Sequence, residues 1–247
     1  MNKKTKRVAK AMQFSVVPLL QSQSSAHIPS RVIPMGAKGR LEPTELTKME
    51  KQRLDTILKF MTEVNKLKRV RRTGWVRSKV KNPESVADHS FSTALLAYII
   101  AKDLKLDANK AMLMALTHDI NEVISGDIAT RHREELQETS NVEKAKVEHK
   151  SHMKMLSHLQ RKDRGEFTKI WKELKNQSSE EAKLVKQIDA LDYIIQIALY
   201  SKEVDKKRFE TFFLTARKKI SNPDLLYIFD KVKKTVYGNK KINKGAI

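Results

Sequence analysis

Four ionisable residues stand in segments that are otherwise apolar or bounded by turns: His89, His118, Asp119 and Asp189. A charged carboxylate in an apolar helix is costly unless it pairs with a cation or binds a metal. Two neutral imidazoles and two carboxylates suit a divalent ion, from Mg²⁺ and Mn²⁺ to Fe²⁺, Co²⁺, Ni²⁺ or Zn²⁺. Since the four residues fall on three expected helices, the sequence suggests that these helices meet at one metal ion.

A structural explanation of the same residues stays open. An adjacent His-Asp pair occurs by chance in roughly a quarter of chains of this length. His89 could form a surface pair with Asp88, and Asp189 could pair with a buried lysine or arginine. The dipeptide alone therefore does not decide between the two interpretations.

Glu122 and Asp127 favour the metal site. On a helix, Glu122 would project to the same side as His118 and Asp119, about one turn further on. Gly126 permits a tight helix exit that would aim Asp127 back toward that side. Such a carboxylate pair could act as general acid and base or bind a second ion. The alternative is that Glu122 faces solvent and Asp127 caps a turn.

Trp75 is a second candidate for binding. It follows three arginines, at positions 69, 71 and 72, and precedes Arg77 and Lys79. One indole beside five cations suits an aromatic base carrying a phosphate, although Trp75 could equally fill the core under a loop. The other histidines are weaker candidates. His149 and His152 suit a helix face or an interface, His132 and His158 are expected to be exposed, and His27 lies in the N-terminal tail.

The elements that must position these residues are expected to be helices. Apolar residues recur at helical spacing, Gly (7) and Pro (6) are scarce, and no segment alternates as a strand would. We therefore predict an all-α bundle with the metal site at its centre, formed by one domain over residues 42–236. The expected helices cover about residues 46–67, 82–105, 108–124, 139–160, 166–176, 179–201, 204–220 and 223–236.

The charge of the 247-residue chain is concentrated outside this domain. Residues 1–41 hold eight Lys or Arg and residues 231–247 hold six, with no acid in either, so 14 of the 50 basic residues lie at the ends. The middle carries the other 36 against 29 acidic residues, a net charge of +7 out of the total +21. The modest charge of the domain therefore argues against a nucleic-acid partner.

Both ends of the chain are expected to be tails. The basic, Ser-rich residues 1–41 are predicted to be disordered or a transit sequence, which would make the chain mitochondrial or organellar rather than cytoplasmic. Residues 237–247 form a Lys-rich C-terminal tail. Without cysteine there is no disulfide or thiol chemistry, and no apolar run approaches the roughly 20 residues of a membrane span.

The order His, His-Asp, Asp resembles the HD-domain metal-dependent phosphohydrolases. A closer resemblance is to the 5′-deoxynucleotidases of the type called HD domain-containing protein 2. It rests on residues 66–76 (KLKRVRRTGWV), 82–89 (NPESVADH), 118–122 (HDINE), 126–128 (GDI) and 177–189 (QSSEEAKLVKQID). The resemblance implies an all-helical enzyme, usually a homodimer, that releases phosphate from deoxyribonucleoside 5′-monophosphates.

The resemblance also implies roles for particular residues. The first divalent ion, such as Mn²⁺, Co²⁺ or Mg²⁺, would be held by His89, His118, Asp119 and Asp189. Glu122, Asp127 and the backbone carbonyl of Ile128 would bind a second ion in members that have one; in single-metal relatives Glu122 matches the catalytic carboxylate and Asp127 a nucleotide contact. Trp75 matches a tryptophan beside the sugar that helps to reject a 2′-hydroxyl.

The chain departs from this pattern at a few positions. Gly74 stands where bacterial deoxynucleotidases have an arginine, so Arg72 would have to substitute, and selectivity for deoxyribose is in question. Asn121 replaces a small alanine, and Ala129-Thr130 lacks a common proline. In the expected mechanism water attacks phosphorus in line, Glu122 orients it, and Arg72 and Arg77 neutralise phosphate charge. The alternatives are an HD phosphohydrolase acting on a ribonucleotide, cyclic or ppGpp-like nucleotide, and a polyanion-binding protein with a vestigial site.

Overall fold

The computed structural model describes residues 45–128 and 140–238, in which every regular element is a helix. In chain order the elements are α1 (Lys48–Val64), η1 (Asn65–Arg69), α2 (Thr73–Arg77), α3 (Val86–Asp103), α4 (Ala108–Thr117), α5 (Glu122–Ser125), α6 (Asn141–Leu156), α7 (Arg161–Asn176), α8 (Glu180–Tyr200), η3 (Lys206–Phe209), α9 (Glu210–Lys219) and α10 (Pro223–Tyr237). The prediction of an all-α fold is confirmed. These helices belong to one compact unit, Thr47–Ile247.

Helices α3, α8 and α10 each begin at a residue whose side chain caps the first turn. Ser85 begins α3 through a capping box with Asp88, in which each side chain bonds the other residue's backbone N–H. We expected Asn82 to start this helix, but the capping box lies three residues later. Similarly, Ser179 caps α8 and Asn222 caps α10, at the starts of the helices expected over residues 179–201 and 223–236.

Three other helix boundaries differ from the prediction. α4 ends at Thr117 instead of continuing to residue 124, because the chain tightens there into turns such as the bond from the Ile120 N–H to the Thr117 carbonyl. α7 begins at Arg161, five residues earlier than expected. The segment expected to form one helix over 204–220 is a short 3₁₀ turn, η3, followed by α9.

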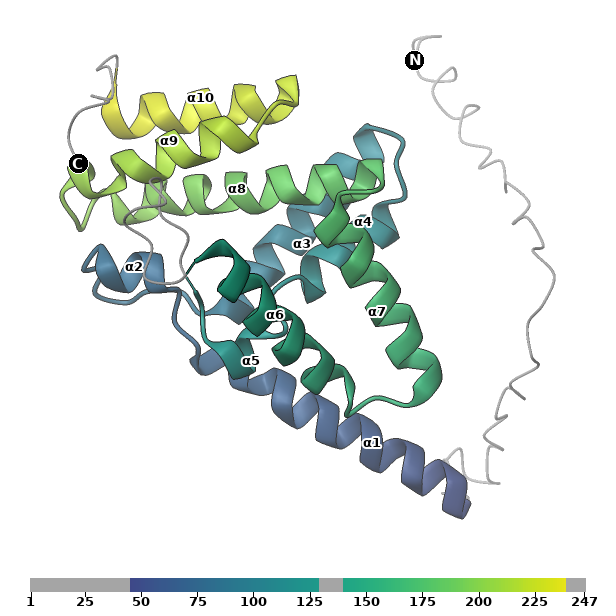
Figure 1. Ribbon diagram of the computed structural model, residues 1–247. Coiled ribbons are helices and arrows are strands. Elements are labelled where there is room, and N and C mark those ends of the chain that lie inside the picture. Colours follow the sequence, from purple (N-terminus) through teal and green to yellow (C-terminus); the bar gives the residue numbers. More distant parts are fainter. Residues whose placement is uncertain (1–44, 129–139, 239–247) are drawn as a thin grey trace, which may run out of the picture. The chain divides into compact units, whose positions relative to one another are not determined.

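Helix α8 is at the centre of the bundle, in contact with α3, α4, α7, α9 and α10, and it lies between the α9–α10 pair and α3 in Figure 1. Four of its apolar side chains, Ile188, Leu191, Ile194 and Ile197, are fully buried. Burial of each such side chain contributes about 1.5–3 kcal/mol. A smaller cluster around Phe60, Val86 and Leu156 joins α1, η1, α3 and α6. The two clusters hold α3, α5 and α8 in place around the site.

No helix among the described residues is long and apolar enough to cross a membrane. Several predictions fall outside the described residues. They concern the tail over residues 1–41 with His27, the Ala129-Thr130 departure, His132, and most of the tail over 237–247.

Candidate metal centre

His118 and Asp119 come together because they follow the end of α4. Neighbouring side chains on a regular helix diverge by about 100°, but here the Oδ2 atom of Asp119 lies 3.0 Å from Nε2 of His118. The His118 Nδ1 atom lies 2.6 Å from the Ala115 carbonyl oxygen and donates a hydrogen bond to it. In the neutral ring, the form that binds a metal, Nε2 therefore carries the lone pair, and this buried atom has no hydrogen-bond partner among the described residues.

His89 enters the same point from α3 and is completely buried. Its Nδ1 lies 2.7 Å from Oδ2 of Asp192, and its Nε2 lies 3.2 Å from Oδ1 of Asp189. Burial and the charge of Arg72 oppose protonation of this ring, but the hydrogen bonds to Asp189 and Asp192 prevail and raise the pKa of His89 to about 9. Without a metal, His89 is therefore a cation held between two carboxylates of α8.

Asp189 completes the group. Its Oδ1 lies 3.2 Å from His89 Nε2 and 3.9 Å from His118 Nε2. One ligand atom each of His89, His118 and Asp119 also lie within 4.8 Å of one another. The structure thus brings together all four side chains that the sequence singled out, from α3, the end of α4 and α8.

These residues fit a divalent cation. The His118 Nε2 lone pair is buried and unpartnered, and the other donors are an imidazole and two carboxylates, which bind Mn²⁺, Co²⁺ and Mg²⁺. Burial opposes ionisation of Asp119, but His118 and Arg72 outweigh it and lower the Asp119 pKa. The pKa of Asp189 is likewise well below its usual value, because its hydrogen bond to His89 and the charge of His118 outweigh burial. Both carboxylates are therefore ionised at neutral pH.

Arg72 joins the metal group to Asp127. Its guanidinium donates to Asp119 Oδ2 at 3.1 Å and lies 3.9 Å from Asp127 Oδ2. The Thr73 backbone N–H donates to Asp127 Oδ2 at 2.7 Å, and the Thr73 hydroxyl donates to the Asp127 carbonyl at 2.6 Å. Gly126 has a φ of +69°, a left-handed conformation that suits glycine and that turns the chain back toward the site.

Glu122 lies next to this network and differs from the other carboxylates. Its Oε2 atom is buried and has no hydrogen-bond partner among the described residues. Burial, followed by the negative charges of Asp119 and Asp127, raises the pKa of Glu122 well above its usual range. A carboxyl group whose pKa is raised holds its proton more readily than an ordinary glutamate, which suits general acid–base chemistry.

The carbonyl of Ile128 is already bonded. The Lys144 ammonium, from α6, donates to it at 2.7 Å. Asp127 similarly accepts the Thr73 N–H. A second ion at Glu122, Asp127 and Ile128 would therefore have to compete with these two contacts.

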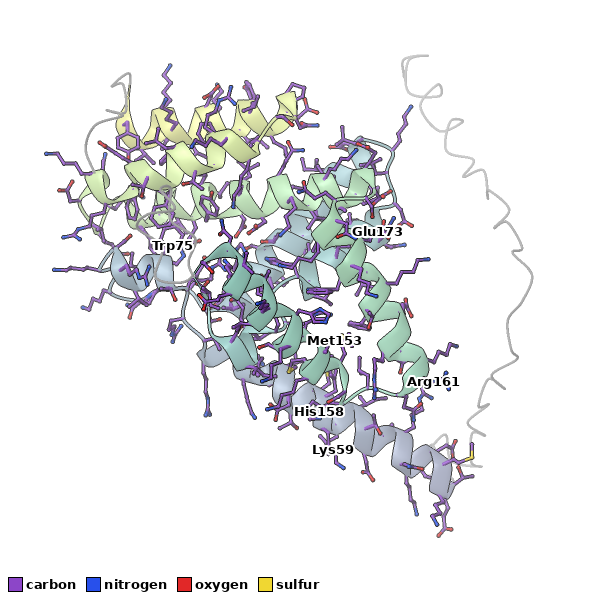
Figure 2. All side chains as sticks on the ribbon, in the orientation of Figure 1. Lys59, Trp75, Met153, His158, Arg161 and Glu173 are labelled. Carbon is purple, nitrogen blue, oxygen red and sulfur yellow. The ribbon has the colours of Figure 1, made fainter. Side chains whose placement is uncertain are left out.

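Trp75 on α2 is 1% exposed and packs in the core (Figure 2). Its indole stacks on Phe212 at a centroid distance of 4.9 Å, and its N–H donates to Glu84 at 2.7 Å. A Cβ atom on Gly74 would come within 3.1 Å of the same Phe212 ring. Trp75 thus fills the core and also lines the pocket beside the metal centre.

The pocket has a volume of about 670 Å³ and opens onto the carboxylate network. Of the predicted site residues, it is lined by Arg72, Trp75, Arg77, His118, Asp119, Glu122, Asp127, Ile128 and Asp189. His89 lies behind them in the core. The pocket therefore gives a ligand direct access to the predicted metal centre.

Three functional candidates escaped the sequence prediction: Asp192, which holds His89; Lys144, which binds Ile128; and Tyr193 in the pocket wall. Asp192 had a detectable signal, because it lies one turn from Asp189 on the same apolar helix. His152, expected on a helix face or interface, is instead buried against Trp171, with a ring-centroid distance of 4.4 Å. His149 lies 5.4 Å from the same indole, and His158 is half-buried rather than exposed.

The arrangement agrees with comparisons to known proteins. The family model described as HD domain matches residues 64–232, more than half of the chain. The chain belongs to the HD domain family. Its HD domain is 38% identical over 174 residues to 5′-deoxynucleotidase HDDC2 of Danio rerio, across 70% of this chain and 84% of that protein. It is 36% identical over 177 residues to 5′-deoxynucleotidase HDDC2 of Homo sapiens, across 70% of this chain and 82% of that protein.

Solved structures show the same HD-domain fold. A conserved hypothetical protein from Pyrococcus furiosus matches with a TM-score of 0.58 and 31% identity, over 72% of this chain and 99% of that chain. A predicted metal-dependent phosphohydrolase from Magnetospirillum magnetotacticum matches with the same TM-score at 20% identity, over 78% of this chain and 96% of that chain, and shows the fold alone. The resemblance to the HD-domain family is thus confirmed.

Proposed function

We propose that this HD domain is a metal-dependent 5′-deoxynucleotidase, which hydrolyses dAMP, dCMP, dGMP and dTMP to deoxyribonucleoside and phosphate. The observation that carries the proposal is the meeting of His89, His118, Asp119 and Asp189 at one buried point that opens onto a pocket. The activity named for its HDDC2 relatives supports the choice of reaction.

In this proposal the four side chains hold one divalent cation, with Mn²⁺, Co²⁺ and Mg²⁺ as the candidates. When bound, the cation supplies Lewis-acid chemistry, which neutralises phosphate charge and makes water more acidic. Asp192 keeps the His89 ring oriented through Nδ1, and the Ala115 carbonyl does the same for His118. Such outer contacts set ligand geometry and basicity.

Glu122 is our candidate for the proton-handling group. Its raised pKa makes it a stronger base than an ordinary glutamate, which suits it to accept a proton from the attacking water. Asp127, anchored by Thr73, lines the pocket beside it and is assigned to contact the nucleotide. Glu122, Asp127 and the Ile128 carbonyl also remain candidates for a second ion, with Lys144 as the competitor for that carbonyl.

Arg72, Arg77 and Trp75 are assigned to the substrate. Arg72 and Arg77 line the pocket and would offset phosphate charge. Phe212 packs against Gly74, the position at which bacterial deoxynucleotidases have an arginine. Discrimination between AMP and dAMP is therefore the property in which this enzyme is expected to differ most from the bacterial deoxynucleotidases. The alternative substrate is a ribonucleotide or another nucleotide.

We also propose a homodimer. The α3 residues Phe91, Leu95 and Ile99 are spaced four apart, so they form one stripe, and they are exposed by 68%, 52% and 48%. Met112 and Leu116 of the adjacent α4 are exposed as well. An apolar surface of this kind on a folded domain suits contact with a second copy. We place the enzyme in the cytoplasm, or in an organelle if residues 1–41 act as a transit sequence.

The proposal is tested by measuring phosphate release from the four deoxynucleotides and their ribonucleotide counterparts, with protein loaded with Mn²⁺ or Co²⁺. We expect hydrolysis by the wild type and a loss of kcat of about 100-fold or more in Glu122→Gln, with the ion at His89, His118, Asp119 and Asp189 still bound. Glu180→Gln, on an exposed side chain at the start of α8, is the matched control and should retain full activity. A metal-loaded protein that hydrolyses no deoxynucleotide would overturn the assignment.

A further inference from the structure

The pocket has two walls that differ in chemistry, and the predicted metal centre touches both, since Asp189 lies on α8. One wall carries the carboxylates of the predicted metal centre and its surroundings, Asp119, Glu122 and Asp127. The other is formed by α8 and α9, and its lining includes Lys186, Tyr193 and, on α9, Lys219. A bound phosphate near the metal centre would lie between the two.

The two lysines lie at the same end of the α8–α9 pair. The Gln187 side chain, next to Lys186, accepts backbone N–H bonds of 2.8 Å from both Ser221 and Asn222, just beyond Lys219. These contacts tie the first half of α8 to the end of α9. Lys186 and Asp189 are three residues apart on α8, so they share one face of the helix. The lysines therefore flank the metal side of the pocket.

Neither lysine forms a close ion pair with a carboxylate of the described residues, although the charge of Lys219 contributes to the lowered pKa of Asp189. Other lysines on and around these helices are paired, such as Lys183 with Glu180 at 2.7 Å and Lys110 with Glu181 at 3.2 Å. Lys186 and Lys219 have no ion pair within 4 Å in the described part of the chain, although both line a pocket. Cations left without a counterion in a concave site attract an anionic ligand.

Tyr193 supplies an independent observation. It lies one helical turn after Asp189, on the same face of α8, and is only 9% exposed. Its ring packs edge-on against Phe212 at 5.9 Å, whereas its buried hydroxyl has no hydrogen-bond partner among the described residues. A buried hydroxyl without a partner costs free energy. Because Tyr193 lines the pocket, a bound ligand can supply the missing acceptor.

We infer that Lys186, Tyr193 and Lys219 form a phosphate-binding wall, which contacts the phosphate oxygens that the cation would leave free. The Tyr193 hydroxyl donates a hydrogen bond and the two ammonium groups supply positive charge. The inference rests on the proposed function, since the phosphate concerned is that of the substrate and of the released product. It assigns these side chains to binding and positioning, while Glu122 stays the proton-handling group.

The test uses inorganic phosphate, the product, as the probe of the full-length, metal-loaded protein. Isothermal titration calorimetry would compare wild type with Tyr193→Phe, Lys186→Gln and Lys219→Gln. We expect each variant to bind phosphate about tenfold more weakly, the usual scale for losing a hydrogen bond to a charged group. Tyr227→Phe and Lys218→Gln, both on exposed residues of α10 and α9, are the matched controls and should bind like wild type.

A thermal measurement separates binding from folding. Without phosphate, Tyr193→Phe should melt at or above the wild-type temperature, because it removes an unpartnered hydroxyl and keeps the ring. With phosphate, its rise in melting temperature should be smaller than that of wild type. If Tyr193→Phe folds poorly, the double variant of Lys186→Gln and Lys219→Gln decides the question by the same measurement.

The outcomes also separate this inference from the proposed function. If all three variants bind phosphate with the same affinity as wild type, the inference of a phosphate-binding wall is overturned, whether or not deoxynucleotides are hydrolysed. If no deoxynucleotide is hydrolysed but the variants bind phosphate more weakly, the wall stands and the proposed substrate is wrong. With hydrolysis intact, we further expect the variants to raise KM for dAMP more than they lower kcat.

Discussion

Nδ1 of His89 lies 2.7 Å from a carboxylate oxygen of Asp192, although 103 residues separate the two in the chain. Both side chains are buried, so water does not compete for this contact. The bond leaves Nε2 of His89 directed toward Asp189, at 3.2 Å. Asp192 therefore orients a predicted metal ligand without being one of the four itself.

This contact predicts the effect of replacing Asp192. Asp192→Ala should weaken binding of Mn²⁺ or Co²⁺ by about 10- to 100-fold, because the His89 ring loses its orienting acceptor. Titration calorimetry or competition with a chelator measures the change. Asp192→Asn keeps an acceptor oxygen and should recover part of the affinity, whereas Asp230→Ala, on an exposed residue of α10, should have no effect. Equal metal affinity in Asp192→Ala and wild type would contradict the prediction.

His152 predicts a pH dependence of stability. Burial, followed by the nearby His149 and Lys175, lowers the pKa of His152 from its ordinary 6.5 to about 4. The unfolded chain therefore binds the extra proton first as the pH falls. Stability from this residue is complete above pH 6.5 and is lost progressively down to pH 4, a change of about 2 kcal/mol between pH 7 and pH 5.

The variant His152→Phe isolates this term. A phenyl ring can keep the stack on Trp171 but cannot titrate, and it removes two buried nitrogens that have no hydrogen-bond partner in the described residues. Urea unfolding at pH 7 and pH 5 should show a smaller loss of stability in the variant than in wild type. His158→Gln, on a half-buried residue, serves as the control. A pH dependence unchanged by His152→Phe would show that His152 does not titrate as expected.

The exposed stripe of α3 predicts the oligomeric state. Light scattering coupled to size-exclusion chromatography should give the mass of a dimer for wild type and that of a monomer for Leu95→Asp, because a charge would be buried in the interface. Leu58→Asp is the matched control on α1, where Leu58 is 66% exposed. A monomeric wild type would contradict the proposed homodimer. A dimer lost only in Leu58→Asp would instead place the interface on α1.

Local sequence signals predict where most helices lie, but they predict less accurately where each helix ends. Helical spacing of apolar residues and caps such as Ser179 and Asn222 identify most of the helices. The end of α4 at Thr117 has no comparable signal, because no proline or glycine interrupts the chain between Thr117 and Gly126. The turn there depends on contacts such as His118 with the Ala115 carbonyl, which appear only in three dimensions.

The site shows the same division. His89, His118, Asp119 and Asp189 were detectable because each places a polar group in an apolar or turn-bounded setting. Residues that contact the site from another helix were harder to detect. The contact between Lys144 and the Ile128 carbonyl, for example, depends on how α6 packs. For Trp75 the sequence left core and pocket as alternatives, and the structure places it in both.

The separation of His89 and Asp189 along the chain, 100 residues, has a consequence for biosynthesis. A nascent polypeptide cannot assemble all four donors until α8 has left the ribosome, when most of the domain has already been made. The ion is therefore bound late in synthesis, and it stabilises only the completely folded domain. A ligand that binds the native state alone stabilises that state in the same way.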